Sequence, residues 1–246
     1  MPIQVKPLPP VTLPELRQIG KPLRRVDALG KAVGATVYAG DFSMPQMLHA
    51  KVFRSTEASA RIVRLDVSRA RELPGVVCVL TAADLPDARV SQDIPGQTGQ
   101  KARAGSEVPI LAAETVRFYG EQLALAAAET LAIAEAALRL IEVEYEPTPG
   151  VFDPQEAIKP GATLLVPPDN SVARWKIRKG DLAAGFAEAE LVIENSFRLP
   201  YQEHAYIEPE AGVAWIDERG VINIRVSTQV IEHFRNIAKA VGVPHS

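Results

Sequence analysis

A run of prolines and glycines near the middle of the chain limits the folds open to this sequence more than any other feature. Between residues 150 and 170 the sequence contains Pro154, Pro160-Gly161 and Pro167-Pro168, directly after Pro149-Gly150. Proline removes a backbone N–H and fixes φ, so neither a helix nor a central strand passes easily through such a run. We therefore expect a linker over residues 150–170, with one folded unit before it and another after it.

The first unit, residues 28–149, is expected to mix strands with short helices. Arg61–Asp66 alternates apolar and polar residues, which is typical of a half-buried strand. Thr130 is expected to cap an alanine- and leucine-rich helix over Leu131–Leu140. The other expected elements are short strands at 36–38 and 141–145, buried strands at 76–80 and 123–128, capped helical turns at 68–73 and 81–86, and a surface loop over 87–106.

The second unit, residues 171–246, is expected to contain a hairpin followed by a helix. Glu218–Gly220 forms the expected turn between strands 212–216 and 221–226. Ile222, Ile224 and Val226 would then share one face of the second strand. The other expected elements are a helix at 182–187 capped by Asp181, a long strand at 189–199 and an amphipathic helix at 230–241. The fold class is thus α+β, preceded by an extended proline-rich arm over residues 1–27.

Composition narrows the functional class. The chain of 246 residues is 47% hydrophobic and 23% charged, with a net charge of −3, which does not suggest a nucleic-acid-binding surface. Cys78 is the single cysteine, so the chain cannot form an internal disulfide or hold an Fe–S cluster with its own thiolates. No apolar stretch reaches the ~20 residues of a membrane span, and the first residues do not form a signal-peptide pattern. We therefore expect a cytoplasmic protein without a membrane span.

Two short segments carry side chains suited to chemistry. Ser227-Thr228-Gln229 follows the last expected strand; Ser227 or Thr228 would also suit a helix N-cap. The segment Gln202–Pro209 brings Gln202, Glu203, His204 and Glu208 close in sequence. Its carboxylates and histidine could serve acid–base work or a structural polar network. His204 and Glu208 would align only on a helix, which Pro209 disfavours, so we expect no direct metal ligand here.

The sequence resembles a known family along most of its length. Residues 20–55 read GKPLRRVDALGKAVGATVYAGDFSMPQMLHAKVFRS, residues 116–130 read VRFYGEQLALAAAET, and residues 141–151 read IEVEYEPTPGV. These segments resemble the start of the molybdopterin-binding large subunit of the xanthine dehydrogenase/aldehyde oxidase family. The resemblance implies an α/β-hammerhead domain over 28–149, followed by the first part of a molybdopterin-binding domain. Gln122 stands where relatives usually have proline.

The resemblance also assigns site residues. In the family a Ser-Thr-Gln at a strand-to-helix turn binds near the cofactor, and the glutamine amide hydrogen-bonds an oxo ligand on molybdenum. That implies a catalytic and cofactor-binding role for Gln229, with Thr228 and Ser227 as further cofactor-binding residues. The segment QEHAYIEP resembles the family's QEHFYLEP, which implies a supporting network of Gln202, Glu203, His204 and Glu208 near the cofactor. Many relatives continue Ser-Thr-Gln-x-Pro-His, whereas Val230-Ile231-Glu232 follows here, so no role is assigned to Glu232 or His233.

The implied activity is molybdenum hydroxylase chemistry on an N-heterocycle or an aldehyde, with oxygen derived from water. The sequence ends at Ser246, before the glycine-rich loop and the general-base glutamate of the family. We therefore expect a split enzyme, in which another chain carries the rest of the molybdopterin-binding subunit and shares the cofactor. The pterin nucleotide form stays open, the cytosine dinucleotide being one form. A [2Fe–2S] subunit is expected as a further partner, with an FAD subunit as an open addition. The alternative is a truncated, non-catalytic relative that acts as an interaction module.

Overall fold

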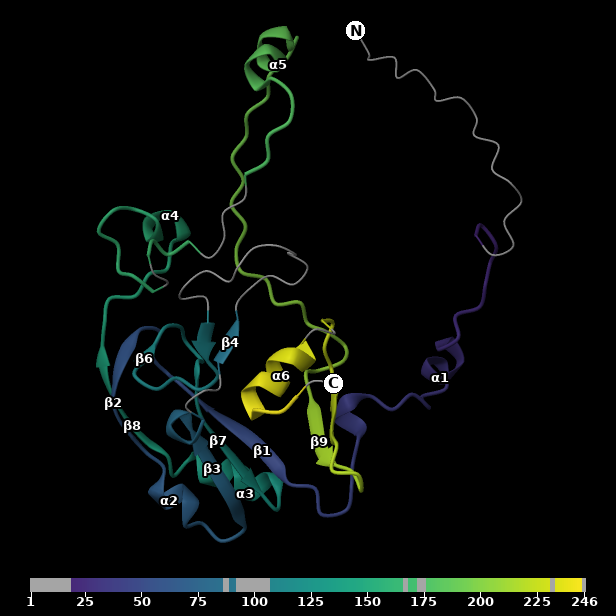
Figure 1. Cartoon of the computed structure of the whole chain (residues 1–246), viewed down its shortest axis with the longest axis vertical. Helices are drawn as coiled ribbons and strands as arrows, with labels where there is room; N and C mark the ends of the chain where they lie inside the picture. Colours follow the sequence, from purple (N-terminus) through teal and green to yellow (C-terminus); the bar gives the residue numbers. More distant parts are fainter. Residues whose placement is uncertain are drawn as a thin grey trace. The chain divides into compact units, whose positions relative to one another are not determined.

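The computed structural model describes residues 19–85, 89–91, 107–165, 168–171, 176–230 and 233–244. The chain divides into two compact units, whose elements are drawn in Figure 1. One unit combines the residues up to Phe42 with Ile207–Ser227, and the other combines Ser43–Tyr206 with the residues from Thr228 onward. Residues 1–18, most of the expected N-terminal arm, lie outside the described residues.

The larger unit contains a three-stranded antiparallel sheet in the order β1–β7–β3. Its central strand is almost entirely alanine and leucine, and Ala124 and Ala126 are fully buried. These small side chains let helix α3 approach closely, and α3 contributes its own fully buried Ala134 and Ala137. The Thr130 hydroxyl accepts the N–H of Ile133 at 3.3 Å, which confirms the expected helix cap. The elements are β1 (His49–Arg54), α2 (Ser68–Arg71), β3 (Val76–Thr81), η2 (Ala82–Asp84), β7 (Gln122–Ala128) and α3 (Leu131–Leu138).

A second antiparallel sheet of the same unit runs in the order β6–β2–β8. Its strands are β6 (Thr115–Val116), β2 (Ala60–Asp66) and β8 (Glu142–Pro147). Val116 and Leu123 are the largest fully buried side chains and belong to one core cluster. Phe53 and Leu65 pack against both this cluster and the cluster beneath α3, so the two sheets share a continuous apolar core.

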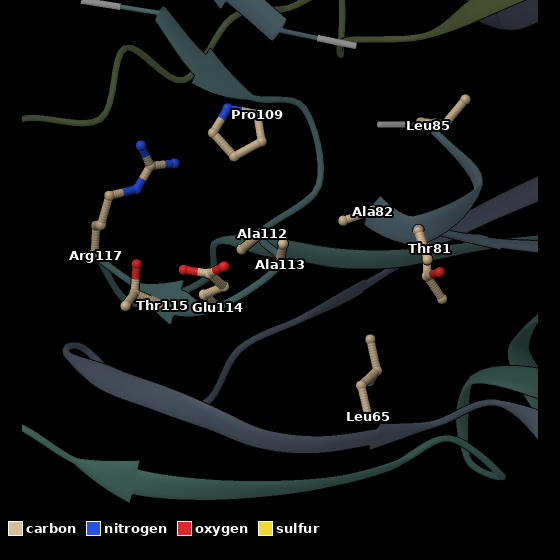
Figure 2. A pocket seen from close by; sticks show the side chains of 11 residues that line it. Leu65, Thr81, Ala82, Leu85, Pro109, Ala112, Ala113, Glu114, Thr115 and Arg117 are labelled. Carbon is tan, nitrogen blue, oxygen red and sulfur yellow. The ribbon is translucent and has the colours of Figure 1, made fainter. Parts of the chain in front are cut away.

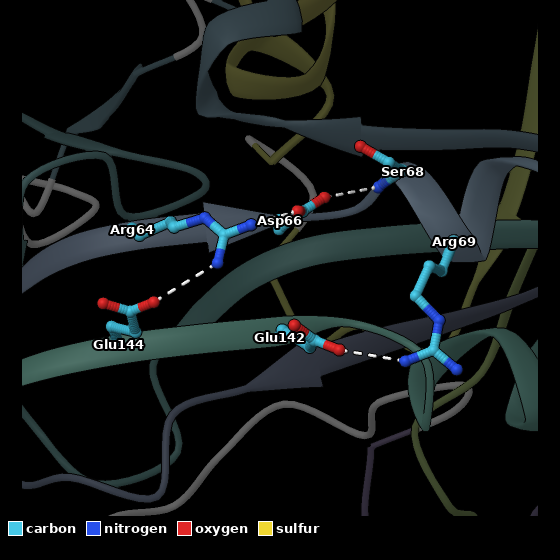
Figure 3. Close-up of polar contacts among 6 residues, drawn as sticks. All are labelled: Arg64, Asp66, Ser68, Arg69, Glu142 and Glu144. Atoms are coloured by element: carbon cyan, nitrogen blue, oxygen red, sulfur yellow. Dashed lines mark hydrogen bonds and ion pairs between the residues drawn. The ribbon is translucent and has the colours of Figure 1, made fainter.

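Paired charges line the solvent side of β2 and β8 (Figure 3). Arg64 contacts Glu144 across the strands at 3.3 Å and Asp66 along its own strand at 2.6 Å. The backbone N–H of Ser68, at 2.9 Å, and Arg64 both hold the pKa of Asp66 below its usual range. The neighbouring pairs are Arg69–Glu142 and Arg61–Glu146. Exposed pairs of this kind are typically worth about 0–1 kcal/mol each, so the ladder indicates a solvated face rather than a site.

The smaller unit is built around the predicted hairpin of β9 (Gly212–Ile216) and β10 (Ile222–Val226). One face of the hairpin is covered: Phe42 stacks on Trp215 with 5.4 Å between ring centroids, and the Arg225 guanidinium lies 5.3 Å from the centre of the Phe42 ring. The opposite face carries the predicted apolar row, which stays exposed. Its members are Ile216, Ile222, Ile224 and Val226, at 70, 40, 42 and 42%. The short helices of this unit are α1 (Ala28–Ala32) and η1 (Ala39–Asp41).

Along the chain, short capped helices lie between β8 and β9. Within the expected linker, the Asp153 side chain accepts the N–H groups of Gln155 at 2.7 Å and Glu156 at 3.3 Å, and thereby begins helix α4 (Pro154–Ala157). The Asp181 side chain accepts the N–H of Ala184 at 3.0 Å, which confirms it as the cap of α5 (Leu182–Glu188). The last helix, α6 (His233–Val241), lies beside β4 (Arg89–Ser91), which pairs with β5 (Glu107–Pro109).

Four sequence expectations need correction. Residues 36–38 do not pair as a strand, and the long strand expected over 189–199 is irregular and exposed. The loop expected over 87–106 contains strand β4, while its residues 87–88 and 92–106 lie outside the described part. The strand over 76–80 is only half-buried, with Cys78 intermediate and Val77 57% exposed. In the first two cases a strand-like pattern finds no partner strand within the described chain, and alternation alone cannot supply one.

Candidate functional site

Ser227 directly follows β10 and extends the hairpin through its side chain. Its backbone N–H donates to Ala211 O at 3.0 Å, and its hydroxyl accepts the N–H of Ala211 at 2.8 Å. The hydroxyl also lies 3.3 Å from Pro209 O. Ser227 therefore fixes the end of the hairpin, and its hydroxyl is engaged by the chain's own backbone.

Thr228 begins the next stretch and is engaged in a different way. Its Oγ1 lies 2.9 Å from His233 Nδ1 and accepts the N–H of Val230 at 3.3 Å. Helix α6 is described from His233 onward, and residues 231–232 before it lie outside the described part. The bond from the Val230 N–H is one that an N-cap hydroxyl also accepts, so the N-cap alternative for Ser227 or Thr228 stays a prediction.

Gln229 differs from both neighbours because it is exposed, and its side-chain amide bonds to no residue that the structure describes. A neutral amide offers two N–H donors and one acceptor without adding a charge. The two preceding hydroxyls hold the local backbone, whereas the Gln229 amide is open to solvent. An amide in this state fits a role as hydrogen-bond donor to a cofactor.

The segment with Gln202, Glu203, His204 and Glu208 forms no helix, as Pro209 predicted, and all of these residues are exposed. His204 stacks on Tyr206 with 5.3 Å between ring centroids, and Glu203 Oε1 accepts the N–H of Ala205 at 3.2 Å. Ala205 adopts φ of 52°, a left-handed conformation that is uncommon for a residue with a Cβ. The supporting network assigned to this segment stays a prediction. Within the described part of the chain, no group of three or more His, Cys, Asp and Glu side chains could hold a metal ion.

A pocket of about 680 Å³ lies in the larger unit, and none of the site residues selected from the sequence lines it (Figure 2). Its lining includes Thr81 and Ala82 on one side and Ala112, Ala113 and Arg117 on the other. The lining is dominated by small and apolar groups, and Figure 2 shows the carboxylate of Glu114 beside Ala113. Such a lining can enclose a small apolar group but offers few side chains that could act in catalysis.

Arg117 in this lining is held by a buried carboxylate that the sequence analysis did not select. Glu121 is 2% exposed; its Oε2 accepts the backbone N–H of Arg117 at 2.6 Å, and its Oε1 accepts Arg117 Nε at 2.9 Å. Gly120, with φ of +84°, makes the tight turn that returns Glu121 toward Arg117. The four-residue spacing of Arg117 and Glu121 was the available signal, but in an irregular turn it does not reveal burial.

Two family profiles together match about four fifths of the chain. The profile described as "Aldehyde oxidase and xanthine dehydrogenase, a/b hammerhead domain" matches residues 33–149. The profile described as "Molybdopterin cofactor-binding domain" matches residues 165–246. No described helix combines the length and apolar composition of a membrane span.

Curated relatives and solved structures agree with these matches. The nicotinate dehydrogenase large molybdopterin subunit of Eubacterium barkeri is 35% identical over 232 residues, which cover 93% of this chain and 52% of that protein. A probable xanthine dehydrogenase subunit of Bacillus subtilis is 38% identical over 86% of this chain and 27% of its own length. The aldehyde oxidoreductase of Desulfovibrio desulfuricans superposes with a TM-score of 0.77 at 28% identity, over 89% of this chain and 25% of that chain.

The chain therefore spans about half, or less, of the relatives it matches. The order of its parts, a hammerhead domain followed by the start of a molybdopterin cofactor-binding domain, is that of their large subunits. This chain belongs to the large-subunit family of the xanthine dehydrogenases and aldehyde oxidases, which are molybdenum hydroxylases.

Proposed function

We propose that this chain is one part of a split molybdenum hydroxylase and works with a second chain that carries the rest of the molybdopterin-binding subunit. The observation that carries the proposal is the pair of domain matches over residues 33–149 and 165–246, combined with the exposed apolar face of the hairpin inside the second match. The proposed boundaries are a hammerhead domain over 28–149, a linker over 150–170 and an incomplete cofactor-binding domain over 171–246.

The exposed apolar face of the hairpin supports a partner chain. Ile222, Ile224 and Val226 are each 40–42% exposed, and Ile216 on the adjacent strand is 70% exposed. Burying such side chains is worth about 1.5–3 kcal/mol each, so a face of this kind favours a covering partner. Several relatives carry the word subunit in their names, which agrees with assembly into a larger complex.

A bound molybdopterin would supply two-electron oxidation of an electron-poor carbon, such as that of an N-heterocycle or an aldehyde, with electrons passing to [2Fe–2S] and FAD groups on other subunits. In this chain the Gln229 amide would donate a hydrogen bond to the cofactor. Ser227 and Thr228 would position that amide, because their hydroxyls hold the backbone on either side of the strand end. Gln202, Glu203, His204 and Glu208 would form the supporting polar network.

We expect Gln229→Ala to lower turnover of the assembled enzyme by about 10–100-fold, the usual cost of losing an outer-sphere partner of a metal site. Gln229→Glu keeps the length of the side chain but loses its N–H donors, so it should fail as Ala does. The matched control is Gln155→Ala, which removes an exposed amide on α4 and should leave turnover unchanged. Steady-state kinetics, normalised to molybdenum content and accompanied by the absorption spectrum of the cofactor, measures the effect. Wild-type kinetics and spectrum in both Gln229 variants would refute the role of this residue.

The split enzyme itself is tested by purifying the tagged chain from its native host. Elemental analysis should find molybdenum and iron, and mass spectrometry should identify a chain with the remainder of the cofactor-binding domain. A metal-free preparation without such a chain would favour the alternative, a truncated interaction module whose exposed hairpin face docks a different protein.

A further inference from the structure

The segment from residue 191 to 201, Leu-Val-Ile-Glu-Asn-Ser-Phe-Arg-Leu-Pro-Tyr, has the pattern of a half-buried strand. Large apolar side chains occupy most odd positions, and Glu194, Ser196 and Arg198 occupy even ones. The structure nevertheless has no helix or strand between Glu188 and Gly212. The odd-numbered apolar side chains are Leu191, Ile193, Phe197, Leu199 and Tyr201, exposed at 74, 74, 87, 88 and 102%.

The backbone N–H and C=O groups of this segment are unpaired, just as its apolar side chains are exposed. No backbone–backbone hydrogen bond joins residues 191–201 to any other described residue. Extended backbone with free N–H and C=O groups is a template for pairing with another strand. Unpaired backbone and a largely apolar odd-numbered face, interrupted only by Asn195, thus coincide on the same eleven positions.

One contact anchors the segment to its own unit and leaves the apolar side open. Arg198, on the even face, reaches Asp153 at 3.2 Å, and Asp153 in turn caps α4. Arg198 and Asp153 also line a hollow of about 790 Å³, together with Phe197, Tyr201 and Phe152, which is itself 76% exposed. The hollow is therefore rimmed by aromatic side chains that nothing in the described chain covers.

We propose that residues 191–201 become a β-strand by pairing with a strand of the partner chain that carries the rest of the cofactor-binding domain, and that the odd-numbered face is buried in that pairing. This inference rests on the proposed split enzyme. The occupant follows from where the segment lies: it belongs to the region matched as cofactor-binding domain, over residues 165–246, and relatives contain a further half to three-quarters of their length beyond the aligned part. The unaligned part of the relatives is therefore expected to contain the rest of the cofactor-binding domain.

Pro200 indicates which edge pairs. In a strand, the backbone groups of alternate residues point toward opposite neighbouring strands. Pro200 lacks an N–H, so it interrupts the edge formed by the even-numbered residues. The odd-numbered N–H groups, from Leu191 to Tyr201, are uninterrupted. The partner strand therefore pairs along the odd-numbered edge.

Hydrogen–deuterium exchange compares the isolated chain with the complex purified from the native host. Exchange of residues 191–201 should slow by about tenfold or more on assembly, and fragmentation to single residues should place the protection on odd-numbered amides. Amides of β7 in the hammerhead core provide the internal control, because they are already paired in the isolated chain.

A pair of variants separates the two faces of the segment. Phe197→Ser should reduce recovery of the mass-spectrometrically identified partner by at least about tenfold, as expected for an aromatic anchor. Ser196→Ala, on the even face, should leave recovery unchanged. Both residues are exposed in the isolated chain, so neither change should alter its thermal unfolding, and that measurement checks it.

The failures of the two proposals are distinguishable. A molybdenum-containing complex that forms normally with Phe197→Ser, and in which residues 191–201 still exchange fast, would overturn this inference and leave the split enzyme intact. Protection by a second copy of the chain, detected as a self-cross-link at this segment, would overturn it too. Absence of both molybdenum and the partner from the wild-type preparation would instead remove the proposed function, and this inference with it.

Discussion

Some polar side chains of this protein are hydrogen-bonded within the chain, whereas the side-chain amide of Gln229 is not. The hydroxyls of Ser227 and Thr228 hydrogen-bond to Ala211 and His233, whereas the Gln229 amide has no partner among the described residues. Glu121 shows the opposite behaviour, since a 2% exposed carboxylate is committed to the Arg117 backbone and guanidinium. The first arrangement suits a ligand site and the second suits a rigid turn.

We expect Glu121→Gln to destabilise the hammerhead domain by about 3 kcal/mol, because it removes the charge that compensates the largely buried Arg117 guanidinium. Urea unfolding of the isolated chain measures the change. Glu114→Gln, which alters an exposed carboxylate nearby, is the control and should stay within about 0.5 kcal/mol of wild type. Equal midpoints for the two variants would contradict the structural role of the buried pair.

At the scale of elements, local signals in the hammerhead domain agree with the tertiary structure. Strand β7 lies where an apolar run predicts it, and helix α3 lies where alanine and leucine content and the Thr130 cap predict it. A second cap joins η2 to the end of β3: Asp84 accepts the backbone N–H of Thr81 at 2.7 Å and its hydroxyl at 2.9 Å. Arg71 approaches the same carboxylate at 3.0 Å. The backbone bond from Thr81 is the main cause that lowers the pKa of Asp84, with Arg71 assisting.

We expect Asp84→Asn to lower stability by about 1 kcal/mol at pH 7, since it weakens hydrogen bonds to a charged acceptor. The pKa of Asp84 is lower in the folded than in the unfolded state. Its contribution is therefore present above the unfolded value of about 3.9 and is lost as the pH falls from there through the folded pKa. Thermal unfolding between pH 7 and pH 3 should show the gap between variant and wild type closing below about pH 4. Glu72→Gln, at the exposed C-cap of α2, should show no gap. A gap for Asp84→Asn that persists at pH 3 would contradict the linkage.

At the scale of the whole molecule, rows of apolar side chains are exposed on one face of β9–β10 and along residues 191–201. The hammerhead domain, in contrast, has a continuous core shared by two sheets. One part of the chain is thus complete in itself, whereas the part matched to the cofactor-binding domain exposes surface that a partner would bury.

We expect the isolated chain to bind a hydrophobic fluorescent dye and to self-associate as its concentration rises, while the native complex does neither. Dye fluorescence and sedimentation velocity of the two preparations measure the difference. The Phe197→Ser variant should lower dye binding by the isolated chain, and Ser196→Ala should not. Equal dye binding by the chain and its complex would show that assembly does not cover these surfaces.

The order of amino acids alone specifies the family, the α+β class and most of the hammerhead elements. Helix caps such as Thr130 and Asp181 depend on neighbours along the chain, so the sequence predicts them directly. The apolar run at 123–128 likewise shows in the sequence as a candidate strand. The same order predicts which side of β10 carries Ile222, Ile224 and Val226, because side chains alternate along any strand.

Folding in three dimensions selects which strand-like patterns find a partner. Residues 191–201 and 36–38 have the composition of strands, yet a strand exists only where another backbone accepts and donates its hydrogen bonds. The burial of Glu121 and the free state of the Gln229 amide likewise became visible only in the folded chain, because each depends on groups that folding brings together or keeps apart.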